Sequence, residues 1–244
     1  MGWYAVYTRE MLLLWKKIGR LGYVFSSIVS PFIYLFAFGY GLGGRVQIDG
    51  GYLPFLAAGI VGITVMMNSF QQTSSSISTG KLYFKIFQSL ILSPISKVEI
   101  VLGIVLAGIV RAILFGGLIF LMAWLVFDAA LFTTTSLVGA ILGAFCFSSL
   151  GVIVGLAVKH PDDVSMVNNF FIMPMTFFGG SFFPLDSLPL WLKSIASLFP
   201  IGSLNYLFRN PGWDIGTLTA AGLLLVLGCI FFAIGVWLLS RYSE

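Results

Sequence analysis

Six long apolar segments dominate this chain and decide which solvent it folds in. They run Leu21–Gly43, Tyr52–Gln72, Val98–Phe127, Ser136–Val158, Val164–Phe183 and Gly216–Ser240. A helix that crosses a bilayer needs about 20 mostly apolar residues, and each segment reaches that length. Only 9% of the residues are charged and 59% are hydrophobic, which leaves too little polar surface to face water. The sequence therefore predicts an all-α integral membrane protein with six transmembrane helices in a single domain, residues 1–244.

The lysines and arginines favour one orientation of these segments. If the N-terminus is cytoplasmic, nine of the thirteen lie on the inner side, three lie on the outer side, and Arg111 falls within a span. Cytoplasmic loops of membrane proteins carry an excess of Lys and Arg. We therefore expect a multi-pass protein of the cell's inner (plasma) membrane with both termini in the cytoplasm. This bias accounts for the formal net charge of +4 without a nucleic-acid partner.

Residues 1–20 carry an amphipathic pattern ahead of the first span. Trp3, Tyr7, Met11 and Leu14 recur at helical spacing, and basic residues flank them. A basic helix with one aromatic-rich apolar face lies in the plane of a membrane interface. We predict an interfacial helix here, with a frayed cytoplasmic tail as the alternative.

The longest predicted inner loop, residues 73–97, contains a second amphipathic helix over residues 80–93. Lys81, Lys85 and Gln88 share one face of this helix, opposite an apolar face. Pro94 ends it, because proline disfavours helical backbone in the residue before it. The helix either contacts a cytoplasmic partner or lies on lipid headgroups.

Two predicted caps mark where spans begin. Ser96 and Glu99 have the spacing of a capping box at the start of the third span. Asp162 or Asp163 caps the start of the fifth span, a role that we prefer to a catalytic pair of acids.

A stripe of small residues runs along one face of the fourth span. The stripe consists of glycines separated by multiples of four residues, and Phe147 interrupts it: Gly139, Gly143, Gly151 and Gly155. Small residues on one stripe allow two helix backbones to approach closely. The stripe fits packing within the chain and packing between two copies equally well.

An apolar stretch over residues 181–211 follows the fifth span. It is too short to cross the bilayer and too apolar to remain in water. Irregular backbone at membrane depth is tolerated only where protein or a water-filled cavity covers it. We therefore predict a re-entrant or interfacial helix on the outer side.

Several polar residues fall inside the predicted spans. Thr64, Asn68 and Gln71 follow one another at i, i+4 and i+7, so one face of the second span is polar. This face lines a substrate path or bonds to neighbouring helices. Asn168 and Asn169 in the fifth span are further candidates for the path, because amides are unfavourable on a lipid-facing helix.

Arg111 is the one basic residue within a predicted span. If the third span enters the bilayer near Val101, a rise of ~1.5 Å per residue places Arg111 ~15 Å deep, close to the midplane. An isolated arginine there costs about 2.5–3.5 kcal/mol even on the lenient insertion scale. It needs a polar partner such as Asn68 or Gln71, or a direct role in transport.

The motifs of the common enzyme classes are absent. The sequence contains no GxxxxGK[ST] nucleotide loop, no HExxH and no GxSxG. His160 is the only histidine, and Cys146 and Cys229 lie in predicted spans, where we expect buried free thiols. We expect no catalytic residue, no metal site and no cofactor in this chain.

The sequence resembles the permeases of ATP-binding-cassette type-2 exporters, the membrane subunits of drug and polysaccharide exporters. The likeness covers nearly the whole chain and depends on the order and spacing of a few stretches. These are Leu90–Ser96, Pro161–Val164, Phe178–Leu185, Leu188–Leu192, Leu198–Ile201 and Leu207–Arg209.

The resemblance implies a set of partners. Two permease subunits, with a homodimer expected, would join two copies of a separate ATPase that binds ATP and Mg. The helix over residues 80–93 would be the coupling helix that contacts this ATPase. The contact residues would be Lys81, Tyr83, Phe84, Lys85, Phe87 and Gln88. The resemblance also implies that the segment 181–211 is an outer re-entrant hairpin.

From this resemblance we expect a permease subunit that moves an amphipathic drug, lipid or lipid-linked saccharide outward, driven by the partner's ATP hydrolysis. The sparse polar residues favour such a substrate. One rival is a self-contained channel or secondary carrier. Another is a membrane-embedded transferase or hydrolase, which would need clustered acids, a Cys/His pair or metal ligands.

Overall fold

The computed structural model describes residues 2–19, 21–43, 48, 50–83, 90, 93–127, 129, 133–185 and 189–241. Throughout these ranges the regular structure is helical. The helices are α1 (Gly2–Ile18), α2 (Leu21–Leu42), α3 (Tyr52–Leu82), α5 (Lys97–Phe127), α6 (Thr134–Ala157), α7 (Pro161–Val167), η1 (Asn168–Ile172), α8 (Met173–Phe178), α9 (Leu190–Ala196), α10 (Pro200–Arg209) and α11 (Ile215–Arg241).

Four helices in the described part of the chain, α3, α5, α6 and α11, are long and apolar enough to cross a membrane. Three of them, α5, α6 and α11, match the third, fourth and sixth predicted spans to within two residues. The first predicted span corresponds to α2, which carries Pro31 and a shorter apolar stretch, Ser27–Gly41. The all-helical membrane fold is confirmed, and the count of six spans stays a prediction.

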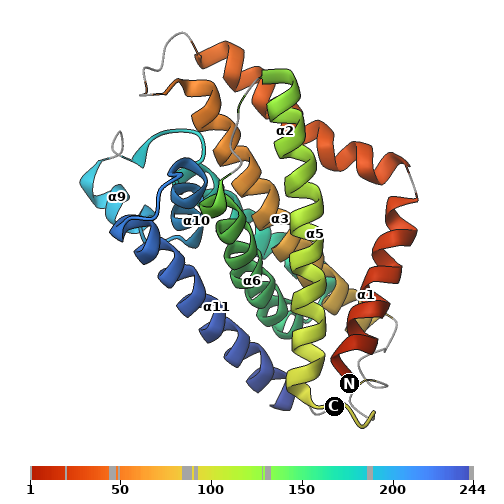
Figure 1. Ribbon diagram of the computed structural model, residues 1–244. Coiled ribbons are helices and arrows are strands. Elements are labelled where there is room, and N and C mark those ends of the chain that lie inside the picture. The colour runs from red at the N-terminus through yellow and green to blue at the C-terminus, as the bar shows by residue number, and fades with distance from the viewer. Residues whose placement is uncertain are drawn as a thin grey trace.

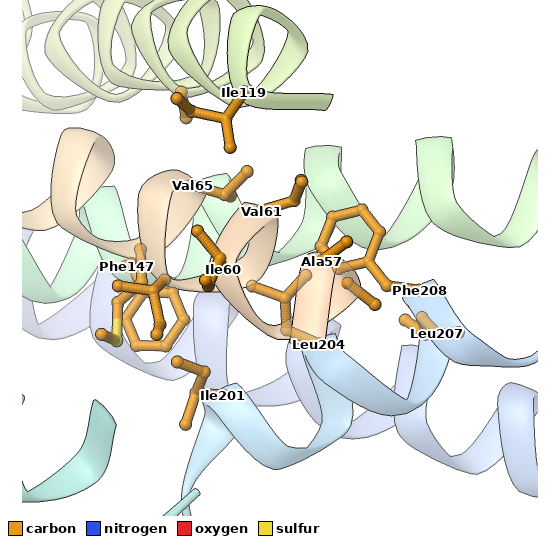
Figure 2. Close-up of a cluster of buried hydrophobic side chains, with 14 of the residues drawn as sticks. Ala57, Ile60, Val61, Val65, Ile119, Phe147, Ile201, Leu204, Leu207 and Phe208 are labelled. Atoms are coloured by element: carbon orange, nitrogen blue, oxygen red, sulfur yellow. The ribbon is translucent and has the colours of Figure 1, made fainter. Parts of the chain in front are cut away.

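The helix α3 lies at the centre of the bundle. It packs against α5, α6 and α10, and most of its apolar side chains are fully buried. Figure 2 shows α3 between these neighbours. The labelled residues are Ala57, Ile60, Val61 and Val65 of α3, Ile119 of α5, Phe147 of α6, and Ile201, Leu204, Leu207 and Phe208 of α10.

The glycine stripe of α6 packs within the chain. Gly143 lies against Leu204 of α10, and Gly155 lies against Ile77 of α3. A methyl group added at Gly151 would meet the Phe70 carbonyl oxygen at 2.7 Å. The structure thus decides between the two packings that the sequence left open.

The structure corrects the end of the second span. The predicted span stops at Gln72 and gives way to a loop, whereas α3 continues to Leu82. Serine hydroxyls in this extension bond to carbonyls of the same helix: Ser74 Oγ donates to Gln71 O at 3.2 Å, and Ser78 Oγ to Ser75 O at 3.3 Å. This local bonding satisfies the serine hydroxyls inside the helix, and the close packing on α6 stabilises the extension.

The bundle has two distinct ends. The start of α1 and the end of α11 lie at the same end (Figure 1), where Val6, Ile100 and Leu239 share a hydrophobic cluster. We call this the termini end. The opposite end holds α9, α10 and the start of α3, and there Tyr52 Oη donates to Phe182 O at 3.3 Å. We call it the hairpin end.

The fifth predicted span is not a single regular helix. The chain passes from α7 through the π-helical turn η1 into α8, which ends at Phe178 rather than at Phe183. Gly180 follows with a φ of +76°, a backbone conformation that side chains other than glycine rarely adopt. At the other end, the Asp163 carboxylate accepts the backbone N–H groups of Lys159 and His160 at 3.2 and 2.8 Å. His160 is thus the N-cap residue, and Asp163, at the third helical position, caps the helix start by reaching back to it, so a capping role of an Asp is confirmed but its N-cap position is not.

The segment 181–211 contains two short helices, α9 and α10. Arg209 Nη2 donates to Phe55 O at 3.1 Å and to Ser181 O at 3.3 Å, and its guanidinium lies 3.5 Å from the centre of the Phe55 ring. Asn205 Nδ2 donates to Gly179 O and to Ser181 Oγ. These bonds hold α10 against α3 at the hairpin end. Its re-entry into a bilayer stays a prediction.

The outermost helix, α11, packs on α6 and α10 and leaves one apolar side uncovered. Figure 1 shows it at the edge of the bundle opposite α1. Cys229 lies on the uncovered side, which corrects the expectation that both thiols are buried; Cys146 is buried as predicted. We assign neither thiol a function.

Candidate substrate groove and the polar residues around it

A groove with a volume of about 260 Å³ lies between α2 and α3. Its lining residues are Ser27, Ser30, Pro31, Tyr34, Ile60, Ile63, Thr64, Met67, Asn68, Gln71 and Gln72. The structure thus brings Thr64, Asn68 and Gln71 together along one open face, as the helical spacing in the sequence predicts. We call this feature the polar groove.

The polar groove follows the axis of α3. Its lining runs from Ile60 to Gln72, a separation of twelve positions that covers about 18 Å of helix. Thr64 Oγ1 donates to Ile60 O at 2.8 Å, and Asn68 Nδ2 donates to Thr64 O at 3.0 Å. These bonds inside the helix fix the orientation of both side chains. Grooves of this kind bind ligands through a few placed polar groups on an otherwise apolar wall.

Lys17, near the end of α1, lies beside the polar groove where the groove lining reaches Gln72. Its ammonium donates to Gln72 Oε1 at 3.3 Å. Burial lowers the pKa of Lys17, and the positive charge of Arg111 lowers it further, while Glu10 acts in the opposite direction. Lys17 is a functional candidate that the sequence reasoning missed, since there it was one of several basic residues flanking an amphipathic helix.

The partner of Arg111 is Glu10, not Asn68 or Gln71 as predicted. Arg111 Nη2 donates to Glu10 Oε2 at 2.9 Å and to Glu10 O at 3.0 Å. Ser76 Oγ of α3 donates to the same carboxylate oxygen at 2.9 Å. Both charged side chains are buried, at 6% and 3% exposed. The ion pair therefore joins α1, α3 and α5.

Glu10 lies on a face of the N-terminal helix that the sequence reasoning did not single out. The fully buried stripe of α1 is Val6, Glu10 and Leu14, which packs along α5. Trp3, Tyr7 and Met11 are only half-buried. A lone acid on a basic helix, in a chain with one arginine inside a span, was the signal available in the sequence.

The ion pair lies far from the hairpin end. Ser76 is 24 residues beyond Tyr52, about 36 Å along α3, which exceeds the ~30 Å thickness of the hydrocarbon core. Arg111 is 16 residues before Phe127, about 24 Å along α5. Arg111 itself lies near the middle of α5, 14 residues after Lys97 and 16 residues before Phe127. Its position at the midplane of a bilayer stays a prediction.

The residues predicted to contact an ATPase lie at the end of α3 and beyond. Lys81 belongs to the last turn of α3, so a separate helix does not begin at residue 80. Its ammonium donates to Leu156 O at 2.6 Å and to Val158 O at 2.9 Å, which satisfies carbonyls at the end of α6. Tyr83 is exposed at the end of α3. Phe84, Lys85, Phe87 and Gln88 lie outside the described residues.

Asn168 and Asn169 lie in η1 and are not among the residues that line the polar groove. Asn168 Oδ1 is buried without a hydrogen-bond partner among the described residues, whereas Asn169 is exposed. π-Helical turns inside longer helices occur frequently at functional sites. The predicted path residues thus fall into three places: the polar groove, the ion pair and the π-helical turn.

The chain matches known proteins over most of its length. The model of the ABC-2 type transporter family matches residues 2–211. Nodulation protein J of Rhizobium leguminosarum bv. viciae is 29% identical over 212 residues, which cover 86% of this chain and 81% of that protein. The inner membrane transport permease YadH of Escherichia coli is 27% identical over 225 residues, covering 88% of this chain and 86% of that protein. The chain therefore belongs to the ABC-2 type transporter family.

Proposed function

We propose that this chain is the permease subunit of an ATP-driven exporter, which moves an amphipathic drug, lipid or lipid-linked saccharide outward across the inner membrane. A separate ATPase subunit supplies the energy, and both termini of the permease are cytoplasmic. The observation that carries the proposal is the family match over residues 2–211, together with a groove of mixed polarity between two membrane helices.

The proposed assembly has two copies of this chain and two copies of the ATPase. The residues after Leu82 contact the ATPase, and α3 links this contact to the polar groove on one continuous helix. ATP binding brings the two ATPase copies together and moves the ends of α3. Such a transporter couples its two sites only if the ligand and the nucleotide bind the two conformations with different affinity.

The test is reconstitution of the chain with its candidate ATPase in liposomes. We expect co-purification of the two proteins, and substrate movement that requires ATP. In the variants Phe84→Asp and Phe87→Asp, we expect both co-purification and transport to fall at least about tenfold, because a buried unpaired charge at an interface costs several kcal/mol.

A matched control places the same charge at the other end of the molecule. Ser194 of α9 is exposed at the hairpin end, so Ser194→Asp should leave ATPase binding unchanged. If the purified chain transports substrate without nucleotide or partner, it is a self-contained channel or carrier and the proposal is wrong. Unchanged ATPase binding in both phenylalanine variants would remove the proposed contact.

A further inference from the structure

Two buried polar atoms of α10 have no hydrogen-bond partner among the described residues. They are the side-chain oxygen Oδ1 of Asn205 and the guanidinium nitrogen Nε of Arg209. Buried polar groups of native proteins are almost always paired, either with protein groups or with ordered water. Since the bundle around α10 is apolar, neither atom can be satisfied by bulk solvent, and each needs a specific partner.

The orientation of the Asn205 amide is fixed by its other contacts. Its Nδ2 atom donates to Gly179 O at 3.2 Å and to Ser181 Oγ at 2.9 Å. The Gly179 carbonyl can only accept, so a half-turn of the amide would place two acceptors against each other. The Oδ1 atom therefore stays on the other side, where it faces Gly62 of α3.

The guanidinium of Arg209 converges on the same place. Its Nη2 atom donates to Ser181 O at 3.3 Å, so both side chains bond to Ser181. Arg209 follows Asn205 by four positions on α10, which makes the two side chains neighbours on one helix face. Nε is a donor and Oδ1 is an acceptor, and the structure leaves them without a bond to each other. The two atoms are thus complementary and close, but not in contact.

The glycine of α3 leaves room beside the Asn205 oxygen. A methyl group at Gly62 would collide with Oδ1, and beyond Asn205 the nearest atom outside α3 would be Phe208 Cδ2 at 3.8 Å. A buried water needs little more than the space of one water-sized sphere and takes two to four polar partners. The place between Asn205, Arg209 and Gly62 meets both conditions.

We propose that one ordered water molecule binds at this place. It accepts a hydrogen bond from Arg209 Nε, donates one to Asn205 Oδ1 and lies against Gly62. Such water-mediated bonds are enthalpically nearly as good as direct ones. The water thereby fixes the plane of the guanidinium from which Nη2 reaches Phe55 O of α3. This inference goes beyond the proposed function, because it concerns how the hairpin end is held on α3.

The experiment detects the water through the ring beside it. X-ray radiolysis converts ordered water into hydroxyl radicals that oxidise the side chains in contact with it, and mass spectrometry of the purified full-length chain in lipid nanodiscs gives the rate at each residue. Phe208 borders the proposed site, whereas Phe147 packs among apolar side chains (Figure 2). We expect Phe208 to be oxidised at least about fivefold faster than Phe147, because an ordered water stays in contact with its ring.

Two variants test the source of the radicals. Gly62→Ala places a methyl group against Asn205 Oδ1, and Arg209→Lys keeps the positive charge but removes the Nε donor. Both should lower the oxidation of Phe208 to about the rate of Phe147, since the site loses its space or one of its two partners. The matched control is Gly222→Ala, where the added methyl meets no atom within 4 Å and the rate should stay at the wild-type value.

Phe208 also borders an apolar pocket beside α5 and α6, which Gly62 does not line. Oxidation that persists in both variants would come from that pocket and would overturn the inference, as would equal rates for the two phenylalanines in wild type. If Gly62→Ala does not fold, Arg209→Lys decides, with Gly222→Ala as the reference. The measurement needs neither an ATPase nor a substrate, so its failure leaves the proposed function standing.

Discussion

Arg111 of α5 and Glu10 of α1 lie 101 positions apart in the sequence and form a buried ion pair with an N–O distance of 2.9 Å. A second bond from the same guanidinium nitrogen reaches the Glu10 carbonyl oxygen, and Ser76 completes the contact from α3. The ion pair therefore fixes the N-terminal helix to the membrane bundle about two turns before the end of that helix.

Breaking this pair should be costly. In Arg111→Leu the Glu10 carboxylate stays buried and loses its closer cation, while Arg9 remains 3.6 Å away, and we expect a loss of up to about 3–5 kcal/mol of stability. The double variant with Glu10→Leu should recover much of it, because no uncompensated charge remains. Thermal unfolding of the purified variants in detergent measures both changes. An Arg111→Leu protein as stable as wild type would show that the pair has no structural role.

The close contact between α3 and the backbone of Ser181 gives a second prediction. A methyl group at Gly59 would collide with the backbone carbonyl of Ser181, which cannot rotate away. Gly59→Ala should therefore lose about 1–3 kcal/mol, the usual cost of overpacking. The control is Gly222→Ala on α11, where the added methyl meets no atom within 4 Å. Similar melting temperatures for the two variants would contradict this packing.

Substitution of Lys81 tests whether this lysine has a structural role or contacts the ATPase. Its ammonium satisfies two carbonyls at the end of α6, and hydrogen bonds to charged groups contribute about 1.5–3 kcal/mol. Lys81→Met should destabilise the protein by a similar amount, whereas Lys159→Met, an exposed lysine nearby, should not. Thermal unfolding and ATPase co-purification are measured on the same preparations. Lost co-purification at unchanged stability would make Lys81 an ATPase contact instead.

A substitution of Asn168 is expected to change stability and transport activity in opposite directions. Its Oδ1 atom is buried without a partner among the described residues, so Asn168→Leu should leave stability unchanged or raise it by about 1–2 kcal/mol. If the π-helical turn serves transport, the same variant should transport more slowly. Asn169→Leu, on the exposed side, is the comparison. Full transport with raised stability would exclude Asn168 from the path.

Apolar periodicity and length were enough to predict the helices that face lipid. Three spans, the capping role of Asp163 and the capping box of Ser96 and Glu99 match the structure, with Glu99 N–H donating to Ser96 Oγ at 3.2 Å. These features depend on neighbours in sequence or on the solvent. The prediction failed where distant residues decide. The serine-rich end of α3 is helical because it packs on α6, and Glu10 is buried because Arg111 meets it.

For the same reason, only part of the candidate site could be predicted from the sequence. Thr64, Asn68 and Gln71 share a face by helical spacing alone, so the sequence placed them together. Lys17 reaches Gln72 only because the Glu10 pair holds α1 beside α3, and no local pattern contains that distance. The proximity of residues on one helix can be predicted from sequence spacing, whereas the proximity of residues from three packed helices cannot.

The unbroken course of α3 also has a mechanical consequence. Gln72 and Leu82 lie on one helix, about 15 Å apart along its axis, with no proline or bulge between them. A force applied just past Leu82 therefore reaches the groove wall as a tilt of a stiff rod, without a relay of side-chain rearrangements. Because Lys81 is bonded to the final turn of α6, α6 would move together with α3 as one rigid body. The polar groove between α2 and α3 would widen or narrow with this motion.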